Sequence, residues 1–145
     1  MTRVLGDDWA LPGLDDQNRA FFTAGVLTLQ QCQSCQHVQH PPEDVCEKCQ
    51  SFELGSFSSA GAGRVESVVV VHHPVHPGLK DHVPYAVVLV SVDDAPGLMV
   101  AGNVVGTEPD AVAIGDPVQV TFEDVTDPAT ETRLLIPQWK IVEDD

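Results

Sequence analysis

The sequence is poor in basic residues. It has 7 Lys and Arg against 22 Asp and Glu, which gives a formal net charge of −15 over 145 residues. Proteins that bind nucleic acid contact the phosphates through clusters of Lys and Arg, and anionic membrane surfaces attract basic segments for the same reason. The charge balance therefore argues against a nucleic-acid partner and against a membrane partner.

Long apolar runs are also absent. No stretch reaches the roughly 18 residues that a membrane-spanning helix needs, and residues 1–6 lack the apolar core of a signal peptide. We therefore expect a cytoplasmic protein whose thiols stay reduced.

The motifs that mark common catalytic centres are missing as well. The sequence contains neither a Gly-x-Ser-x-Gly motif nor a glycine-rich phosphate loop. An active site needs a nucleophile or an acid–base group in a prepared setting. We therefore expect no catalytic residues and no turnover by this chain alone.

Cysteine is scarce, but all four cysteines fall into one pattern. They form two Cys-x-x-Cys pairs ten residues apart: Cys32, Cys35, Cys46 and Cys49. Two such pairs fold into facing knuckles whose four thiolates surround one ion, and zinc suits a closed four-sulfur site. Iron in a rubredoxin-like site is the alternative metal, and two disulfides are the alternative without a metal.

The segment around the cysteines reads as a short helix followed by a ribbon of hairpins. Asp15 and Asp16 precede a helix predicted over residues 17–24, and Gly25 suits its end. Short strands are predicted over 26–31 and 37–42. His37 and His40 are interpreted as surface or partner-facing residues, because four thiolates already complete the metal site. Two phenylalanines and a tryptophan form either core or an apolar surface for another subunit: Phe21, Phe22 and Trp9.

The second half reads as a small barrel. Residues 56–63 are small and predict a flexible hinge. Strands are predicted over 65–72, 83–92, 98–103, 117–123 and 133–139, with the longest connection between the third and fourth. This pattern matches a five-stranded Greek-key barrel of the OB type. The predicted fold is mainly β, with an N-terminal segment and helix (1–25), a zinc ribbon (26–55) and an OB-fold domain (60–142).

Several short motifs, among them Phe21-Phe22, Pro41-Pro42 and Gly102-Asn103, are similar to those of a family of acyl-CoA-associated proteins. The members of this family join a short helix, a rubredoxin-like zinc ribbon and an OB-fold. The family was long catalogued as a domain of unknown function. The resemblance runs from about residue 15 to 139. One departure is that Gln36 and Gln50 follow the second cysteine of each pair, where the family commonly has Gly. The motifs that carry the resemblance are Phe21-Phe22, residues 29–35, Pro41-Pro42, residues 70–74, residues 83–85, Gly102-Asn103, residues 114–118 and residues 122–124.

The resemblance implies a non-catalytic partner of thiolase-superfamily enzymes. Relatives accompany a thiolase, a synthase or a lipid-transfer-protein-like aldolase that cleaves steroid side chains, and they help to hold or pass on an acyl-coenzyme A. A nucleic-acid-binding ribbon/OB module is the alternative, with Tyr85, Phe122 and Trp139 as its available aromatic residues. An electron carrier that uses the cysteine site is a third reading.

A coenzyme A contact requires local positive charge on this acidic chain. The candidate residues lie on the first barrel strand, in the loop after it and on the second strand. We expect them to form a cleft with Val38 and His40 of the ribbon. An exposed, proline-broken loop without a ligand is the plainer reading of this segment, and a second metal site at its histidines is a further alternative. The coenzyme A candidates are Arg64, His72, His73, Lys80 and Tyr85.

Overall fold

The computed structural model describes residues 4–143 and is mainly β. The described residues contain no helix with the length and apolar character needed to cross a membrane. The elements, in chain order, are α1 (Arg19–Thr23), β1 (Leu27–Cys32), β2 (Val38–Gln39), β3 (Leu54–Ser59), β4 (Ala62–Val71), the 3₁₀ turn η1 (Pro77–Leu79), β5 (Tyr85–Val92), β6 (Met99–Val105), the 3₁₀ turn η2 (Pro109–Ala111), β7 (Pro117–Thr126) and β8 (Arg133–Ile141).

Helix α1 is shorter than the predicted range. The Asp15 carboxylate accepts hydrogen bonds from the backbone N–H groups of Gln17, at 2.9 Å, and Asn18, at 2.8 Å. These bonds hold residues 16–18 in a turn, so the helix begins only at Arg19. Gly25 ends it with a φ of 75°, in the left-handed region that glycine adopts readily.

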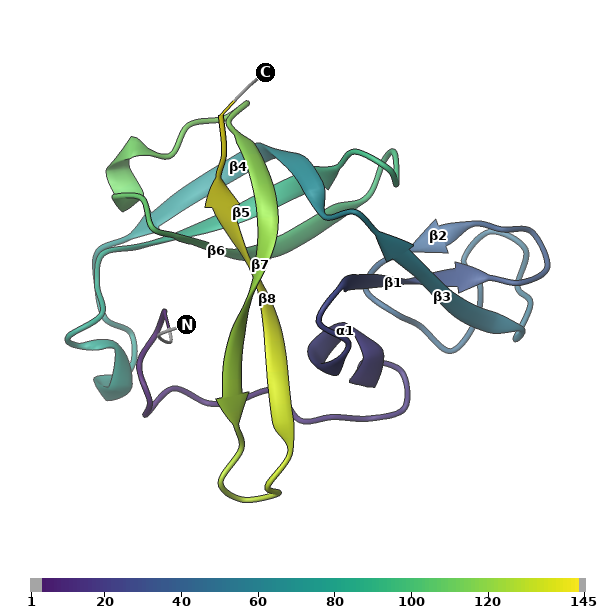
Figure 1. The fold of residues 1–145 in the computed structure, drawn as a ribbon, viewed down its shortest axis with the longest axis horizontal. Coiled ribbons are helices and arrows are strands. Elements are labelled where there is room, and N and C mark those ends of the chain that lie inside the picture. Colours follow the sequence, from purple (N-terminus) through teal and green to yellow (C-terminus); the bar gives the residue numbers. More distant parts are fainter. Residues whose placement is uncertain (1–3, 144–145) are drawn as a thin grey trace.

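The ribbon is a three-stranded antiparallel sheet in the order β2-β1-β3. In this sheet Gln30 of β1 pairs with Gln39 of β2. On its other side β1 pairs with β3 over its whole length, from the pair of Leu27 with Ser59 to the pair of Cys32 with Leu54. Figure 1 shows the ribbon at one side of the molecule, with β3 leading directly into β4.

The remaining five strands form a closed barrel in the order β4-β5-β6-β8-β7, with β4 also paired to β7. All neighbours are antiparallel except β6 and β8. Numbered within the barrel, this is the order 1-2-3-5-4 of an OB-fold. The predicted fold class is confirmed, and the 3₁₀ turn η2 lies in the long connection between β6 and β7.

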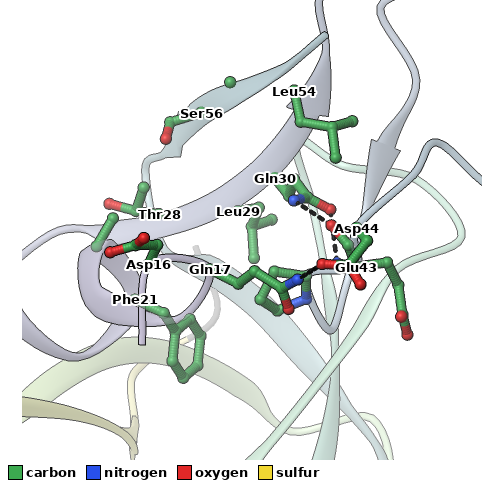
Figure 2. A pocket seen from close by; sticks show the side chains of 13 residues that line it. Asp16, Gln17, Phe21, Thr28, Leu29, Gln30, Glu43, Asp44, Leu54 and Ser56 are labelled. Carbon is green, nitrogen blue, oxygen red and sulfur yellow. Dashed lines mark hydrogen bonds between the residues drawn. The ribbon is translucent and has the colours of Figure 1, made fainter. Parts of the chain in front are cut away.

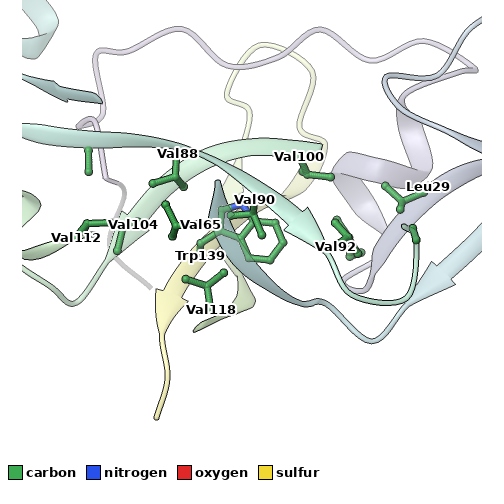
Figure 3. Close-up of a cluster of buried hydrophobic side chains, with 13 residues drawn as sticks. Leu29, Val65, Val88, Val90, Val92, Val100, Val104, Val112, Val118 and Trp139 are labelled. Atoms are coloured by element: carbon green, nitrogen blue, oxygen red, sulfur yellow. The ribbon is translucent and has the colours of Figure 1, made fainter. Parts of the chain in front are cut away.

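The core fills the barrel and continues into the ribbon. Trp139 of β8 is fully buried among valines of the surrounding strands, as Figure 3 shows. Strand β5 places Ala86, Val88, Val90 and Val92 inward at every second position, as a strand with one core face does. Leu27 and Leu29 of β1 belong to the same buried cluster. The ribbon therefore packs against the barrel, and the predicted domain boundaries stay a prediction.

The flexible hinge predicted over residues 56–63 is wrong. These residues end β3 and begin β4, and only residues 60 and 61 lie between the two strands. Their small size serves close packing: a Cβ on Gly61 would come within 2.2 Å of a Val120 methyl, and one on Gly63 within 2.4 Å of the Ser91 carbonyl oxygen. A small residue fits both a flexible linker and a crowded junction, so composition alone did not distinguish them.

Asp94 fixes this junction. Its carboxylate accepts hydrogen bonds from the Ser59 hydroxyl, at 2.6 Å, and from the Ala60 N–H, at 2.8 Å. Partial burial acts to raise the pKa of Asp94, but these two bonds outweigh it and hold the pKa below its usual value. The β5–β6 turn thus ties down the point where the ribbon enters the barrel.

We predict that Asp94→Ala lowers the free energy of unfolding by about 1 kcal/mol at pH 7, because two hydrogen bonds to an exposed charge are lost. Since the folded-state pKa is lowered, the contribution of Asp94 is present above the unfolded pKa of about 4 and is lost as the pH falls through the folded value. The difference between wild type and variant should therefore shrink below pH 4 in denaturant titrations. The neighbouring exposed Asp93→Ala is the control; an equal loss of stability in both variants would contradict this role for Asp94.

Candidate functional site

The four cysteine sulfur atoms converge at the end of the ribbon. Cys32 is the last residue of β1, Cys35 lies in the turn after it, and the second pair lies in the loop between β2 and β3. The Sγ atoms of Cys32 and Cys49 are 3.6 Å apart, those of Cys35 and Cys46 are 3.7 Å apart, and all four lie within 4.8 Å of one another. A tetrahedron with zinc–sulfur bonds of about 2.3 Å has sulfur–sulfur edges of about 3.8 Å. The donor set therefore fits a bound zinc ion, and these four residues are positioned to bind a metal.

Backbone amides of the knuckles stabilise the thiolate form. The amide of Cys35, followed by that of Ser34, donates to Sγ of Cys32 and lowers its pKa to about 6, although burial opposes the shift. The amide of Cys49 likewise lowers the pKa of Cys46. Both shifts favour the deprotonated sulfur that a metal ion requires.

Gln36 and Gln50, which stand where the family commonly has Gly, take a left-handed backbone conformation. Their φ angles are 68° and 64°. Each N–H donates to the carbonyl oxygen of the first cysteine of its pair, at 3.0 Å for Gln36 and 2.9 Å for Gln50, which closes the knuckle. A side chain costs about 1 kcal/mol or more in this region, where glycine is unstrained.

The two ribbon histidines differ in their surroundings. Nε2 of His37 lies 2.7 Å from a carboxylate oxygen of Glu47 at the surface, as expected. The surface interpretation is wrong for His40, whose ring packs on Phe21 at a centroid distance of 4.9 Å. Burial lowers the pKa of His40. This histidine therefore joins the ribbon to α1.

The neighbouring phenylalanines face different parts of the structure. Phe21 packs against the main core cluster. Phe22 lines a cavity of about 370 Å³ under the N-terminal arm, together with Trp9, Leu11 and Ile136. The two rings therefore pack against different parts of the structure.

A groove between α1 and the ribbon has a volume of about 300 Å³ and was not predicted (Figure 2). Its walls carry the carboxylates of Asp16, Glu43 and Asp44, and its lining contains no Lys, Arg or His. Gln17 donates to the Asp44 carboxylate across the groove, and Gln30 holds the backbone of Glu43. Negative charge makes this groove unsuited to a phosphate group.

The coenzyme A candidates do not form one cluster. Tyr85 pairs with Val71 at the end of β4, so it lies beside His72, and Lys80 follows in the same loop. Arg64 lies near the opposite end of β4, where its guanidinium donates to the Gly115 carbonyl at 3.1 Å. Eight residues of strand separate it from His72, or about 26 Å. The prediction that Arg64 joins the others is wrong, because an extended strand carries sequence neighbours apart.

The predicted cleft between the ribbon and this loop is also absent. Figure 1 shows the ribbon and the loop containing η1 on opposite sides of the barrel, with β4 running between them. The N-terminal arm contacts the loop instead: the Trp9 and His76 rings meet edge to face at 5.4 Å. Within residues 4–143, the four cysteines are the sole group placed to hold a metal, so the loop histidines form no second site there.

The aromatic residues considered for a nucleic-acid interface are not presented together. Trp139 is fully buried in the barrel core, while Phe122 and Tyr85 are half-buried. Single-strand-binding surfaces need exposed rings on which bases stack. The structure therefore does not support that alternative.

Comparison with known proteins decides the family. The model of the ChsH2 rubredoxin-like zinc ribbon matches residues 22–55, and the model of the ChsH2 C-terminal OB-fold domain matches residues 58–123. The structure of the Ltp2-ChsH2(DUF35) aldolase contains a chain that is 33% identical, with a TM-score of 0.75; the alignment covers 90% of this chain and 98% of that one. The chain belongs to the DUF35 family.

Two longer relatives match this DUF35 chain over part of their length. One is the probable enoyl-CoA hydratase alpha subunit of Thermomonospora curvata, 37% identical over 110 residues, which are 74% of this chain and 33% of the relative. The other is the 3-oxo-4,17-pregnadiene-20-carboxyl-CoA hydratase alpha subunit of Mycobacterium tuberculosis, 34% identical over 127 residues, which are 85% of this chain and 39% of the relative. The DUF35 chain thus spans 33% of the first protein and 39% of the second.

We predict that Cys46→Ser abolishes stoichiometric metal binding and increases amide hydrogen exchange in the knuckles and β2. The barrel should stay folded, because all but two members of the core cluster lie outside the ribbon. Elemental analysis and hydrogen exchange of wild type and variant would measure this. Ser34→Ala, which changes an exposed serine in the first knuckle, is the control. Wild-type protein that lacks metal after purification without chelator would contradict the assignment.

Proposed function

We propose that this chain is a non-catalytic accessory subunit that docks on a thiolase-superfamily enzyme and helps it to bind or pass on an acyl-coenzyme A. One observation carries the proposal: the chain corresponds over nearly its whole length to a chain of the Ltp2-ChsH2(DUF35) aldolase. That similarity favours a lipid-transfer-protein-like aldolase as the partner, with a thiolase or a synthase as other members of the same class.

The acyl-coenzyme A part of the proposal is supported by the names of the two longer relatives. Both are named as hydratase alpha subunits for coenzyme A thioesters, one of them carrying a steroid-derived acyl group. The region shared with this chain makes up 33% of one relative and 39% of the other. We infer a role in a complex that processes acyl-coenzyme A, with steroid side-chain degradation as the favoured setting.

The accessory role fits the chemistry of the cysteine site. Four thiolates complete the tetrahedral coordination of zinc and leave no open position for water or substrate. When bound, zinc would stabilise the fold of the ribbon, and Cys32, Cys35, Cys46 and Cys49 would hold it. The chemistry of the reaction would then belong to the partner subunit.

If coenzyme A contacts this chain directly, we infer that it does so at the loop after β4. Lys80 and His73 are exposed there, His72 lies 3.9 Å from Asp110, and Tyr85 is close by in the barrel. The loop also borders a cavity of about 430 Å³ that Lys80 lines together with His76. Arg64 is not included, because it lies at the other end of the strand.

The proposal predicts that the purified chain alone has no turnover on acyl-coenzyme A substrates. Mixing it with a thiolase-superfamily partner should give a stable complex whose aldol-cleavage or thiolase rate per partner active site exceeds that of the partner alone. The assay compares this chain, the partner and the mixture, and a denatured sample of this chain is the control. Turnover by the chain after removal of any trace partner would contradict the non-catalytic role.

The loop site predicts different effects for two cations. Lys80→Ala should raise the KM of the complex for acyl-coenzyme A several-fold and weaken its salt dependence, because one phosphate contact to an exposed cation contributes about 1 kcal/mol. Arg64→Ala should leave the KM within about two-fold of wild type, since Arg64 lies about 26 Å away along β4. Equal effects of the two substitutions, or no effect of Lys80→Ala, would exclude the loop as the coenzyme A site.

A further inference from the structure

The outer face of the β4-β5-β6 sheet is apolar and uncovered. We call its six central positions the outer sheet face: Ser67, Val69, Val87, Leu89, Met99 and Ala101. The strand register makes them neighbours. Val69 of β4 pairs with Val87 of β5. In the next row, Leu89 of β5 pairs with Ser67 of β4 on one side and with Ala101 of β6 on the other. Met99 of β6 lies in the row after that, where it pairs with Ser91. Within residues 4–143, α1 and the N-terminal arm pack elsewhere, against β8 and the loop around η1.

The exposure of this face is unusual for an antiparallel sheet. Val69 is 59% exposed, Met99 49%, Leu89 39% and Val87 37%. A sheet with one solvated face normally alternates apolar and polar residues, whereas strands covered on both faces read as nearly continuous apolar runs. Strand β5, Tyr85–Val92, follows the second pattern, although the chain itself covers only its inner face. The sequence is therefore that of a strand whose outer face is also buried in an assembly.

Charge indicates what kind of surface covers it. A fifth of the chain's residues are charged, yet none of the six positions is. The exposed charges that border the face are two acids and one base: Glu66 lies in the bulge of β4, Asp93 follows the end of β5, and Arg64 pairs with Ser91 beside Met99. A second copy of this chain would bring together two molecules that each carry a formal charge of −15. A different protein with an apolar centre and without this excess of negative charge fits both the apolar face and the net charge.

We propose that the outer sheet face docks the thiolase-superfamily subunit. This inference rests on the proposed function and adds the surface by which the two proteins assemble. The face spans about 10 Å across its three strands, so it forms the centre of an interface that typically buries about 800 Å² per partner. The centre of such an interface is depleted of charged residues, and none of the six positions carries a charge.

The test is the affinity of purified variants for the partner subunit, measured by isothermal titration calorimetry. Val69→Glu and Leu89→Glu should each raise the Kd at least about 30-fold, because each places an uncompensated charge in a desolvated interface. Val26→Glu is the matched control, since Val26 is 48% exposed and precedes β1, away from this face; its Kd should stay within about two-fold. Glu66→Gln should mainly reduce the salt dependence of association.

Melting temperature and zinc content show that each variant is folded, and Met99→Glu replaces any variant that is not. If the wild-type chain binds the partner and the Glu variants bind it with the same Kd, the outer sheet face is not the docking surface. The proposed function would still stand in that case. A wild-type chain that binds no thiolase-superfamily partner would overturn the proposed function, and this inference with it. Self-association of the isolated chain that Val69→Glu abolishes would assign the face to a second copy and so overturn the proposal.

Discussion

The convergence of four thiols determines how the first half of the chain folds. Four sulfur atoms within 4.8 Å cannot all carry charge unless a cation lies among them, and bound structural zinc contributes on the order of 10 kcal/mol of folding free energy. That energy would offset the left-handed backbones of Gln36 and Gln50 and stabilise a sheet in which β2 has only two residues. A bound metal would also hold the end of β1, the strand whose Leu27 and Leu29 enter the barrel cluster. It would thereby help to position the ribbon on the barrel.

The junction then makes ribbon and barrel a continuous unit. Strand β3 passes into β4 through a crowded two-residue junction that the Asp94 carboxylate holds, and His40 joins the ribbon to α1. A continuous unit of this kind suits an accessory subunit, because docking one face of the barrel on a partner also fixes the orientation of the ribbon. The loop after β4 adjoins the outer sheet face, because Tyr85 lies on the same side of β5 as Val87 and pairs with Val71 at the end of β4. Assembly and ligand contact would therefore use neighbouring surfaces of the chain.

Much of this arrangement was predictable from the sequence, for identifiable reasons. Cysteine spacing determined the metal site, because two knuckles can face each other in few ways. Alternating valines predicted the barrel strands, and the long connection between the third and fourth strands predicted their OB topology, which the family resemblance also implied. The resemblance singled out Gln36 and Gln50 as departures from the family pattern. The predictions that failed concerned long-range packing. A small-residue stretch fits a hinge or a crowded turn equally well, and the nearness of Arg64 and His72 in sequence hid their separation along β4. The packing of His40 on Phe21 left no local signal.

The central claim is that this chain works as part of a complex with a thiolase-superfamily enzyme. Native mass spectrometry of material purified through a tag on that enzyme tests it most directly. The account predicts a hetero-oligomer in which each copy of this chain, of 15.6 kDa, carries one zinc ion. A spectrum that shows the tagged enzyme without this chain, while the chain remains folded and metal-loaded in the unbound fraction, would contradict it.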